Sequence, residues 1–382
     1  MNNKFIDLAV TGIQGLNPYQ PGKPIEALER ELGISNIIKL ASNENPIGPS
    51  KSVLKALKSD TLEVALYPDG NGFTLKQALA KKLAVNEDQI TLGNGSNDIL
   101  DMIARVFLCE GREAIFSQYA FAVYPIATQA VGAVSKIATA FPSDHTTMPY
   151  GHDLNEMLAL LTDKTRVIFI ANPNNPTGTW LTKPELINFI DKVPRDVIVV
   201  MDEAYFEYVD ETEYPDTLQW LGDYPNLIVT RTFSKIYGLA SLRVGYSVCS
   251  ADIADLLNRV RQPFNVNTVA LMAATKALAD DEHVKNCADI NRTGLKFWKT
   301  ACKERQLDFI PTVGNFITID MGQDAASLFE ALLRQGVIVR PVANYGLNQH
   351  LRITIGTEEQ NHRCLTALDK VLAENSLQVD RL

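Results

Sequence analysis

The sequence predicts an α/β protein, with a mostly parallel sheet in a large domain and a smaller α+β domain at the C-terminal end. The chain has 382 residues, which is more than one hydrophobic core usually serves. From residue 50 onward helical patterns alternate with short apolar runs, and this order changes after about residue 280. We expect an N-terminal arm over 1–45, a large domain over 46–280 and a small domain over 281–382.

The first 45 residues are expected to form an extended arm. Asn17-Pro18 and Asn45-Pro46 interrupt regular structure and leave room for one short helix near 24–32. An extended arm buries little of its own apolar surface and is stabilised by packing against another part of the protein. We expect the arm to pack against the small domain.

The large domain should contain six buried strands, because six short apolar runs are separated by helical patterns. These runs are Ala114–Phe116, Ala133–Ile137, Val167–Ala171, Val197–Met201, Leu227–Thr230 and Val244–Val248. A long helical stretch over 252–305 then leads into the small domain. There we expect strands near 315–320, 337–340 and 350–355, with a helix over 324–335.

Composition narrows the range of partners. The formal net charge of −9 disfavours a nucleic-acid ligand. No apolar run approaches the roughly 20 residues of a membrane span, and the apolar stretch near residues 5–10 is too short for us to expect a signal peptide. The five cysteines and five histidines show no metal-binding spacing, so we expect reduced thiols, no metal site and a cytoplasmic location.

Two of the expected strands end in reactive side chains. The run 197–201 is followed by Asp202, and the run 227–230 leads within five residues to Lys235. Parallel strands present such ends to one crevice, where ligands bind. A carboxylate and a lysine there suit pyridoxal phosphate, whose ring nitrogen needs an acid and whose aldehyde reacts with an amine. A lysine after a strand is, however, often merely solvated.

Further residues suit the phosphate of that cofactor. Arg243 lies in an apolar context flanked by glycines, where a buried guanidinium needs an anion. The segment 93–97, Gly-Asn-Gly-Ser-Asn, precedes an amphipathic helical pattern, so its backbone N–H groups can cradle a phosphate. Taken alone, this segment is equally well explained as a helix cap.

Four ordered motifs together resemble the aspartate-aminotransferase superfamily of fold-type I pyridoxal-phosphate transferases. They are Asn-Pro-Asn-Asn-Pro-Thr-Gly at 172–178, Asp-Glu-Ala-Tyr at 202–205, Thr-Phe-Ser-Lys at 232–235 and Ser-Leu-Arg-Val-Gly at 241–245. Within the superfamily the chain most resembles the histidinol-phosphate aminotransferases, through the motifs at 40–46, 66–70, 339–341 and 351–356.

The resemblance implies that Lys235 forms the Schiff base with the cofactor and that Asp202 pairs with its ring nitrogen. Asn175 and Tyr205 would bind its phenolic oxygen. The remaining cofactor contacts would come from Gly95, Ser96, Asn97, Thr232, Ser234, Arg243 and, from a partner subunit, Tyr67. Tyr124, with Tyr119 as the alternative, would stack on the ring.

For substrate, the resemblance implies a carboxylate clamp at Arg352 and a phosphate or distal-carboxylate site at Arg340, with Tyr19 and Asn43 in the same pocket. The implied reaction is transamination between histidinol phosphate and 2-oxoglutarate, giving imidazole-acetol phosphate and glutamate, in a homodimer. An aromatic-amino-acid aminotransferase, a threonine-phosphate decarboxylase and a non-catalytic ligand-binding module remain alternatives.

Overall fold

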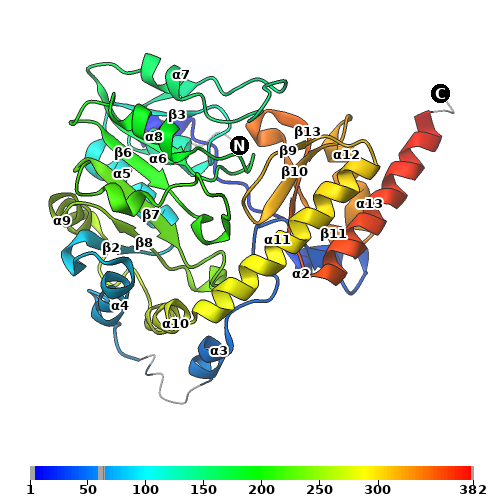
Figure 1. Ribbon diagram of the computed structural model, residues 1–382, viewed down its shortest axis with the longest axis horizontal. Coiled ribbons are helices and arrows are strands. Elements are labelled where there is room, and N and C mark those ends of the chain that lie inside the picture. Colours follow the sequence, from blue (N-terminus) through cyan, green and yellow to red (C-terminus); the bar gives the residue numbers. More distant parts are fainter. Residues whose placement is uncertain (1–4, 59–62, 64, 380–382) are drawn as a thin grey trace.

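The computed structural model of the protein describes residues 5–58, 63 and 65–379. A seven-stranded sheet with helices on both faces forms the larger body, and a four-stranded sheet with three long helices beside it forms the smaller one (Figure 1). The α/β architecture expected from the sequence is confirmed. No helix within the described residues combines the length and the apolar character needed to cross a membrane.

The large sheet has the order β2-β8-β7-β6-β5-β3-β4, and only β8 runs antiparallel to its neighbours. Its strands are β2 (Ile90–Gly93), β3 (Glu113–Ser117), β4 (Val134–Ala138), β5 (Thr165–Ala171), β6 (Ile198–Asp202), β7 (Leu227–Thr232) and β8 (Gly245–Val248). All but β2 were predicted. The four residues of β2 are too few, and too close to the glycines that follow, to stand out as an apolar run.

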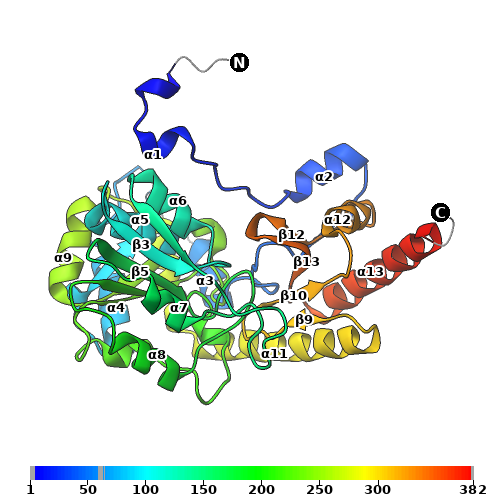
Figure 2. The same cartoon turned by 90° about the horizontal axis from the view of Figure 1, so that it is seen from above.

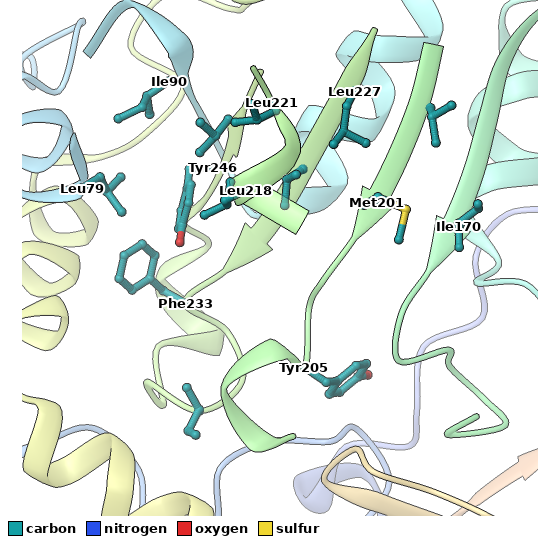
Figure 3. Close-up of a cluster of buried hydrophobic side chains, with 14 of the residues drawn as sticks. Leu79, Ile90, Ile170, Met201, Tyr205, Leu218, Leu221, Leu227, Phe233 and Tyr246 are labelled. Atoms are coloured by element: carbon teal, nitrogen blue, oxygen red, sulfur yellow. The ribbon is translucent and has the colours of Figure 1, made fainter. Parts of the chain in front are cut away.

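Alternate residues of each central strand point into two separate cores, because side chains alternate across a sheet. In β6, Val199 and Met201 enter one core, and Ile198 and Val200 enter the other. Figure 3 shows part of the first core, in which Met201 and Ile170 come from neighbouring strands. The first core is covered by α3 (Lys51–Leu57), α4 (Phe73–Leu83), α7 (Leu154–Ala159), α8 (Lys183–Ile190) and α10 (Thr268–Leu278), and the second by α5 (Ser96–Phe107), α6 (Val123–Ala130) and α9 (Ala251–Val260).

The small body is an antiparallel sheet of order β12-β13-β10-β9. Its strands are β9 (Phe309–Ile310), β10 (Phe316–Asp320), β12 (Arg340–Val342) and β13 (Leu347–Thr354), and its helices are α12 (Ala325–Arg334) and α13 (Glu358–Val379). Trp298 is fully buried at the centre of its core. The expected strand near 337–340 is divided into β11 (Val337–Ile338), which pairs elsewhere, and β12.

Helix α11 (Asp281–Glu304) joins the two bodies. Near its start Cys287 is buried in the first core of the large sheet, whereas Leu295, Trp298 and Cys302 belong to the core of the small one. One rigid helix therefore serves both cores, and the domain boundary at 281 remains a prediction.

The N-terminal segment contributes to both bodies. Its elements are η1 (Ile6–Leu8), α1 (Thr11–Gln14), α2 (Ile25–Leu32) and β1 (Ile38–Lys39). The expected helix is α2, which buries Leu28 against Leu333 and Ile338, while β1 pairs in parallel with β11. By contrast, α1 lies beside α6 of the large body (Figure 2).

Short 3-10 helices complete the connections: η2 (Glu87–Gln89), η3 (Phe206–Tyr208), η4 (Thr217–Trp220), η5 (Ala240–Leu242) and η6 (Ala343–Tyr345).

Candidate active site

A cavity of about 220 Å³ lies where the carboxyl ends of β5, β6 and β7 and the start of α5 meet the small sheet. Thirteen of the residues singled out from the sequence line it: Tyr19, Asn43, Ser96, Asn97, Asn175, Asp202, Tyr205, Thr232, Ser234, Lys235, Arg243, Arg340 and Arg352. Residues separated by more than 300 positions in the chain therefore meet at one site. Four of the thirteen are lysine or arginine, so the cavity suits an anionic ligand.

Asp202, the last residue of β6, is buried with 4% of its surface exposed. The hydroxyl of Tyr124 donates to its Oδ2 atom at 2.8 Å, and the hydroxyl of Thr230 donates to its Oδ1 atom at 3.0 Å. Burial raises the pKa of Asp202, while these hydrogen bonds and the positive charge of Lys235 oppose the rise. The carboxylate is therefore fixed in position at both oxygens.

Lys235 follows β7 and donates from Nζ to the backbone oxygen of Ser42 at 3.2 Å. Burial, followed by the charge of Arg352, lowers the pKa of Lys235 to about 8. A lysine amine that loses its proton near neutral pH can act as a nucleophile and as a base.

The start of α5 and the loop after β7 form a compact cradle. Gly95 adopts φ +79°, and a Cβ atom there would overlap the guanidinium of Arg243. Arg243 in turn donates to the Ser234 hydroxyl at 3.3 Å. The cradle thus combines a helix N-terminus, a hydroxyl and a guanidinium, which are the groups that bind phosphate.

Arg352, on β13, is buried with 7% of its surface exposed. It donates to Oδ1 of Asn175 at 2.5 Å and to the backbone oxygen of Ala41 at 2.7 Å. Its Nε atom is buried without a hydrogen-bond partner among the described residues. A buried donor without a partner is costly, so this atom is a candidate contact for a bound anion.

Asn43 and Tyr205 form a buried pair beside the cavity, in which Nδ2 of Asn43 donates to the Tyr205 hydroxyl at 2.9 Å. Burial raises the pKa of Tyr205 to about 12, so the hydroxyl keeps its proton. Figure 3 shows the Tyr205 ring beyond the end of β6. The backbone of Asn43 has a positive φ of +54°. Two hydrogen bonds with the Thr354 hydroxyl, one from the Asn43 backbone N–H and one to its Oδ1 atom, hold it in this conformation.

The mouth of the cavity is formed in part by the N-terminal segment. Arg340 donates to the backbone oxygen of Gln20 at 2.7 Å. Tyr19, which precedes Gln20 in the chain, has a half-exposed side chain. Both residues line the cavity, as expected.

The ring-stacking assignment needs correction. Tyr124 is fully buried, stacks on Phe169 at 4.8 Å between ring centroids, and does not line the cavity. Tyr119 packs edge-on against Tyr150 and does not line it either. The aromatic residue on the cavity wall is Phe121. Tyr124, Ala127 and Thr128 form the i, i+3, i+4 buried face of α6.

Tyr67 also lies away from the cavity of its own chain. Its side chain is 82% exposed and stacks on Phe264 at 4.7 Å between ring centroids. Its expected role depends on a partner subunit. Ser42 and Ala204 also line the cavity, although the sequence indicates no role of its own for either residue within its motif.

No group of three or more histidine, cysteine, aspartate or glutamate side chains suited to a metal ion occurs among residues 5–58, 63 and 65–379.

The model of the family described as aminotransferase class I and II matches residues 35–368. The chain belongs to this family. The match includes every cavity residue named above except Tyr19, and it confirms the family resemblance inferred from the motifs.

Individual relatives of this class I/II aminotransferase are named more narrowly. Histidinol-phosphate aminotransferase 2 of Methylococcus capsulatus is 56% identical over 365 residues, covering 96% of this chain and 98% of the relative. The protein of that name from Pseudomonas fluorescens Pf-5 is 53% identical, covering 98% and 100%. The crystal structure of histidinol-phosphate aminotransferase from Sinorhizobium meliloti in complex with pyridoxal-5'-phosphate superposes with a TM-score of 0.86 at 28% identity, covering 96% and 97%.

Proposed function

We propose that the chain is a pyridoxal-phosphate-dependent histidinol-phosphate aminotransferase, which exchanges the amino group of histidinol phosphate with 2-oxoglutarate in histidine biosynthesis. One observation carries the proposal. A single cavity brings together a buried carboxylate, a lysine whose pKa is lowered to about 8, a phosphate cradle and two further arginines. Relatives with this name share more than half of the sequence across nearly the whole chain.

The cavity residues fit pyridoxal phosphate. Asp202 would pair with the ring nitrogen, Phe121 would cover the ring in place of Tyr124, and Asn175 and Tyr205 would bind the phenolic oxygen. The phosphate would lie in the cradle of Gly95, Ser96, Asn97, Thr232, Ser234 and Arg243. When bound, the cofactor supplies an electron sink that makes the α-hydrogen of an amine substrate acidic.

Lys235 moves the proton. Because its pKa is lowered to about 8, an appreciable fraction of its amine is unprotonated near neutral pH. An amine in that state can take a proton at Nζ from the substrate carbon and return it to a neighbouring carbon. The Ser42 carbonyl, 3.2 Å from Nζ, orients the amine between transfers.

Arg340 and Arg352 bind the anionic end of the substrate. Histidinol phosphate carries a phosphate and no carboxylate, whereas glutamate and 2-oxoglutarate carry two carboxylates. Guanidinium groups bind both kinds of anion with paired N–H groups. A pair of arginines can therefore serve both half-reactions, with Tyr19 and Asn43 lining the same pocket.

The homodimer is part of the proposal. The exposed stacked rings of Tyr67 and Phe264 form an apolar surface of the kind that protein partners cover. In a dimer this surface would bring Tyr67 to the phosphate cradle of the other subunit. A cytoplasmic location is proposed from the five free cysteines, four of which are buried.

The test is a single-turnover experiment. The purified protein is mixed with pyridoxal phosphate, and its absorption is followed after addition of histidinol phosphate, phenylalanine or threonine phosphate. Conversion of the bound cofactor to its amino form fastest with histidinol phosphate supports the proposal. Faster conversion with phenylalanine would indicate an aromatic aminotransferase, and release of carbon dioxide from threonine phosphate a decarboxylase. Cofactor absorption identical in wild type and Lys235→Ala would indicate a non-catalytic module.

A further inference from the structure

Tyr124 makes a contact that a ring-stacking role does not explain. Its hydroxyl lies 2.8 Å from Oδ2 of Asp202, the carboxylate at the base of the cavity. The two residues come from different layers, since Tyr124 is in the first turn of α6 and Asp202 ends β6. The Thr230 hydroxyl, at 3.0 Å, occupies the other carboxylate oxygen.

The position of the Tyr124 hydroxyl is set by packing. The ring is fully buried and lies parallel to Phe169, with an interplanar angle of 10°. Phe116 and Phe121 approach it at centroid distances of 6.3 and 6.0 Å. A ring enclosed by three aromatic neighbours cannot turn its hydroxyl away from Asp202 without disturbing the core.

The contact also has a definite direction of donation. Burial, followed by the negative charge of Asp202, raises the pKa of Tyr124 well above 10, so its hydroxyl keeps the proton at any working pH. Asp202 is faced by Tyr124 from α6, by Thr230 from β7, and by Lys235 and Tyr205 from the loops after β7 and β6. Among these, only Lys235 carries a positive charge, so hydrogen-bond donors provide much of the support for the carboxylate.

We propose that Tyr124 is a positioning residue, which keeps the Asp202 carboxylate ionised and aimed at the ring nitrogen of the cofactor from outside the cavity. The inference rests on the proposed function for the identity of the cofactor. It gives α6 and its aromatic cluster a part in the chemistry, although neither Tyr124 nor Phe169 lines the cavity.

The first test compares Tyr124→Phe with Tyr224→Phe. The control removes an equivalent hydrogen bond, because the Tyr224 hydroxyl donates to Oδ1 of Asp191 at 2.7 Å, away from the cavity. Holoenzyme is prepared with cofactor labelled with ¹⁵N in the ring, and the nitrogen signal is recorded against pH. We expect the proton shared by Asp202 and the ring nitrogen to shift toward Asp202 in Tyr124→Phe, which moves the nitrogen signal toward its unprotonated value, and we expect Tyr224→Phe to behave as wild type.

Steady-state kinetics give a second readout. A hydrogen bond to a charged group contributes about 1.5–3 kcal/mol, so kcat of Tyr124→Phe should fall roughly 10- to 150-fold. The KM for histidinol phosphate should stay within about twofold, because Tyr124 does not line the cavity. The acid limb of the kcat profile should move to higher pH, because an Asp202 with one donor fewer is protonated more easily.

A second variant keeps the ring and the hydroxyl. Site-specific 3-fluorotyrosine at position 124 makes the hydroxyl a stronger donor, so the acid limb should move to lower pH, opposite to the shift in Tyr124→Phe. Wild-type nitrogen signals and pH profiles in both variants would reduce Tyr124 to a packing residue and overturn the inference. Failure of the wild type itself to bind pyridoxal phosphate would overturn the proposed function first.

Discussion

Arg340 and Arg352 stand directly opposite each other on the antiparallel strands β12 and β13, so their side chains leave the same face of the small sheet. Like charges in this arrangement repel each other and favour a bound anion. Each arginine is held by a backbone carbonyl of the N-terminal segment, Gln20 for Arg340 and Ala41 for Arg352. The segment thus aims both guanidinium groups at the cavity.

Replacing either arginine with lysine should weaken binding of both anionic substrates. Lysine keeps the charge but cannot present paired N–H groups, and a lost hydrogen bond to a charged group costs about 1.5–3 kcal/mol. We expect kcat/KM for histidinol phosphate to fall roughly 10- to 150-fold in Arg352→Lys and Arg340→Lys. Arg334→Lys, at an exposed position of α12, is the matched control. Unchanged kcat/KM in both site variants would contradict an anion-binding role.

The phosphate cradle can be tested at two glycines that both have positive φ. Gly95 has φ +79° and Gly111 has φ +83°, but a Cβ atom would meet Arg243 at Gly95 and nothing within 4 Å at Gly111. Both alanine variants should lose about 1–3 kcal/mol of folding stability from the positive φ. Only Gly95→Ala should also bind pyridoxal phosphate more weakly, as measured by equilibrium titration. Equal cofactor affinity in the two variants would argue against the cradle.

Much of the candidate site could be predicted because its reactive residues stand out from their immediate neighbours in the sequence. Asp202 and Lys235 follow buried strands, and Arg243 stands between glycines in an apolar context. Each of these patterns lies within one short segment, so it can be recognised without knowledge of the fold. The same holds for five of the six predicted strands of the large sheet, which are apolar runs with both faces buried, whereas β4 at the edge of the sheet exposes Val134 and Ile137.

What could not be predicted depends on how distant segments meet. Whether Phe121 or Tyr124 faces the cavity is decided by where α6 begins, a matter of two or three residues. β1 has only two residues and exists because β11 lies beside it. Likewise the small sheet places Arg340 opposite Arg352 through a register that includes an irregularity at Pro341–Val342. None of these relations is visible in a single segment.

The lowered pKa of Lys235 should affect the stability of the protein without cofactor. Its amine titrates at about pH 8 in the fold and at 10.5 ordinarily. Between these values the unfolded chain holds a proton that the folded chain has released, so the free energy of unfolding rises with pH across this window. Below about pH 8 both states hold the proton, and the folded protein bears the cost of a buried ammonium group.

Lys235→Met should therefore be more stable than wild type near neutral pH, with a difference that shrinks from pH 8 upward. Denaturant unfolding at several pH values measures it. The difference in the free energy of unfolding between variant and wild type is taken at each pH, so that contributions from tyrosines that titrate in the same pH range cancel. Lys296→Met, at an exposed position on α11, is the control for the removal of a lysine. A constant difference between Lys235→Met and wild type would contradict the lowered pKa.

Mixed dimers can test whether Tyr67 serves the partner subunit. If each site uses Lys235 of one subunit and Tyr67 of the other, a dimer of Lys235→Ala and Tyr67→Phe chains has one site with both changes and one with neither. That second site should bind pyridoxal phosphate with wild-type affinity and turn over substrate. If Tyr67 acted within its own chain, no site of the mixed dimer would be unaltered.

The Tyr67 side chain is 82% exposed, so its ring gains apolar contact only when a second surface covers it. A site shared between subunits, in which the partner covers the ring, is therefore favoured over a site within one chain. Dimers mixed from Lys235→Ala and Tyr224→Phe chains set the activity expected for one intact site, since Tyr224 bonds to Asp191 away from the cavity. Mixed dimers with Tyr67→Phe should match that value. Activity no higher than that of Tyr67→Phe dimers alone would place Tyr67 outside the partner's site.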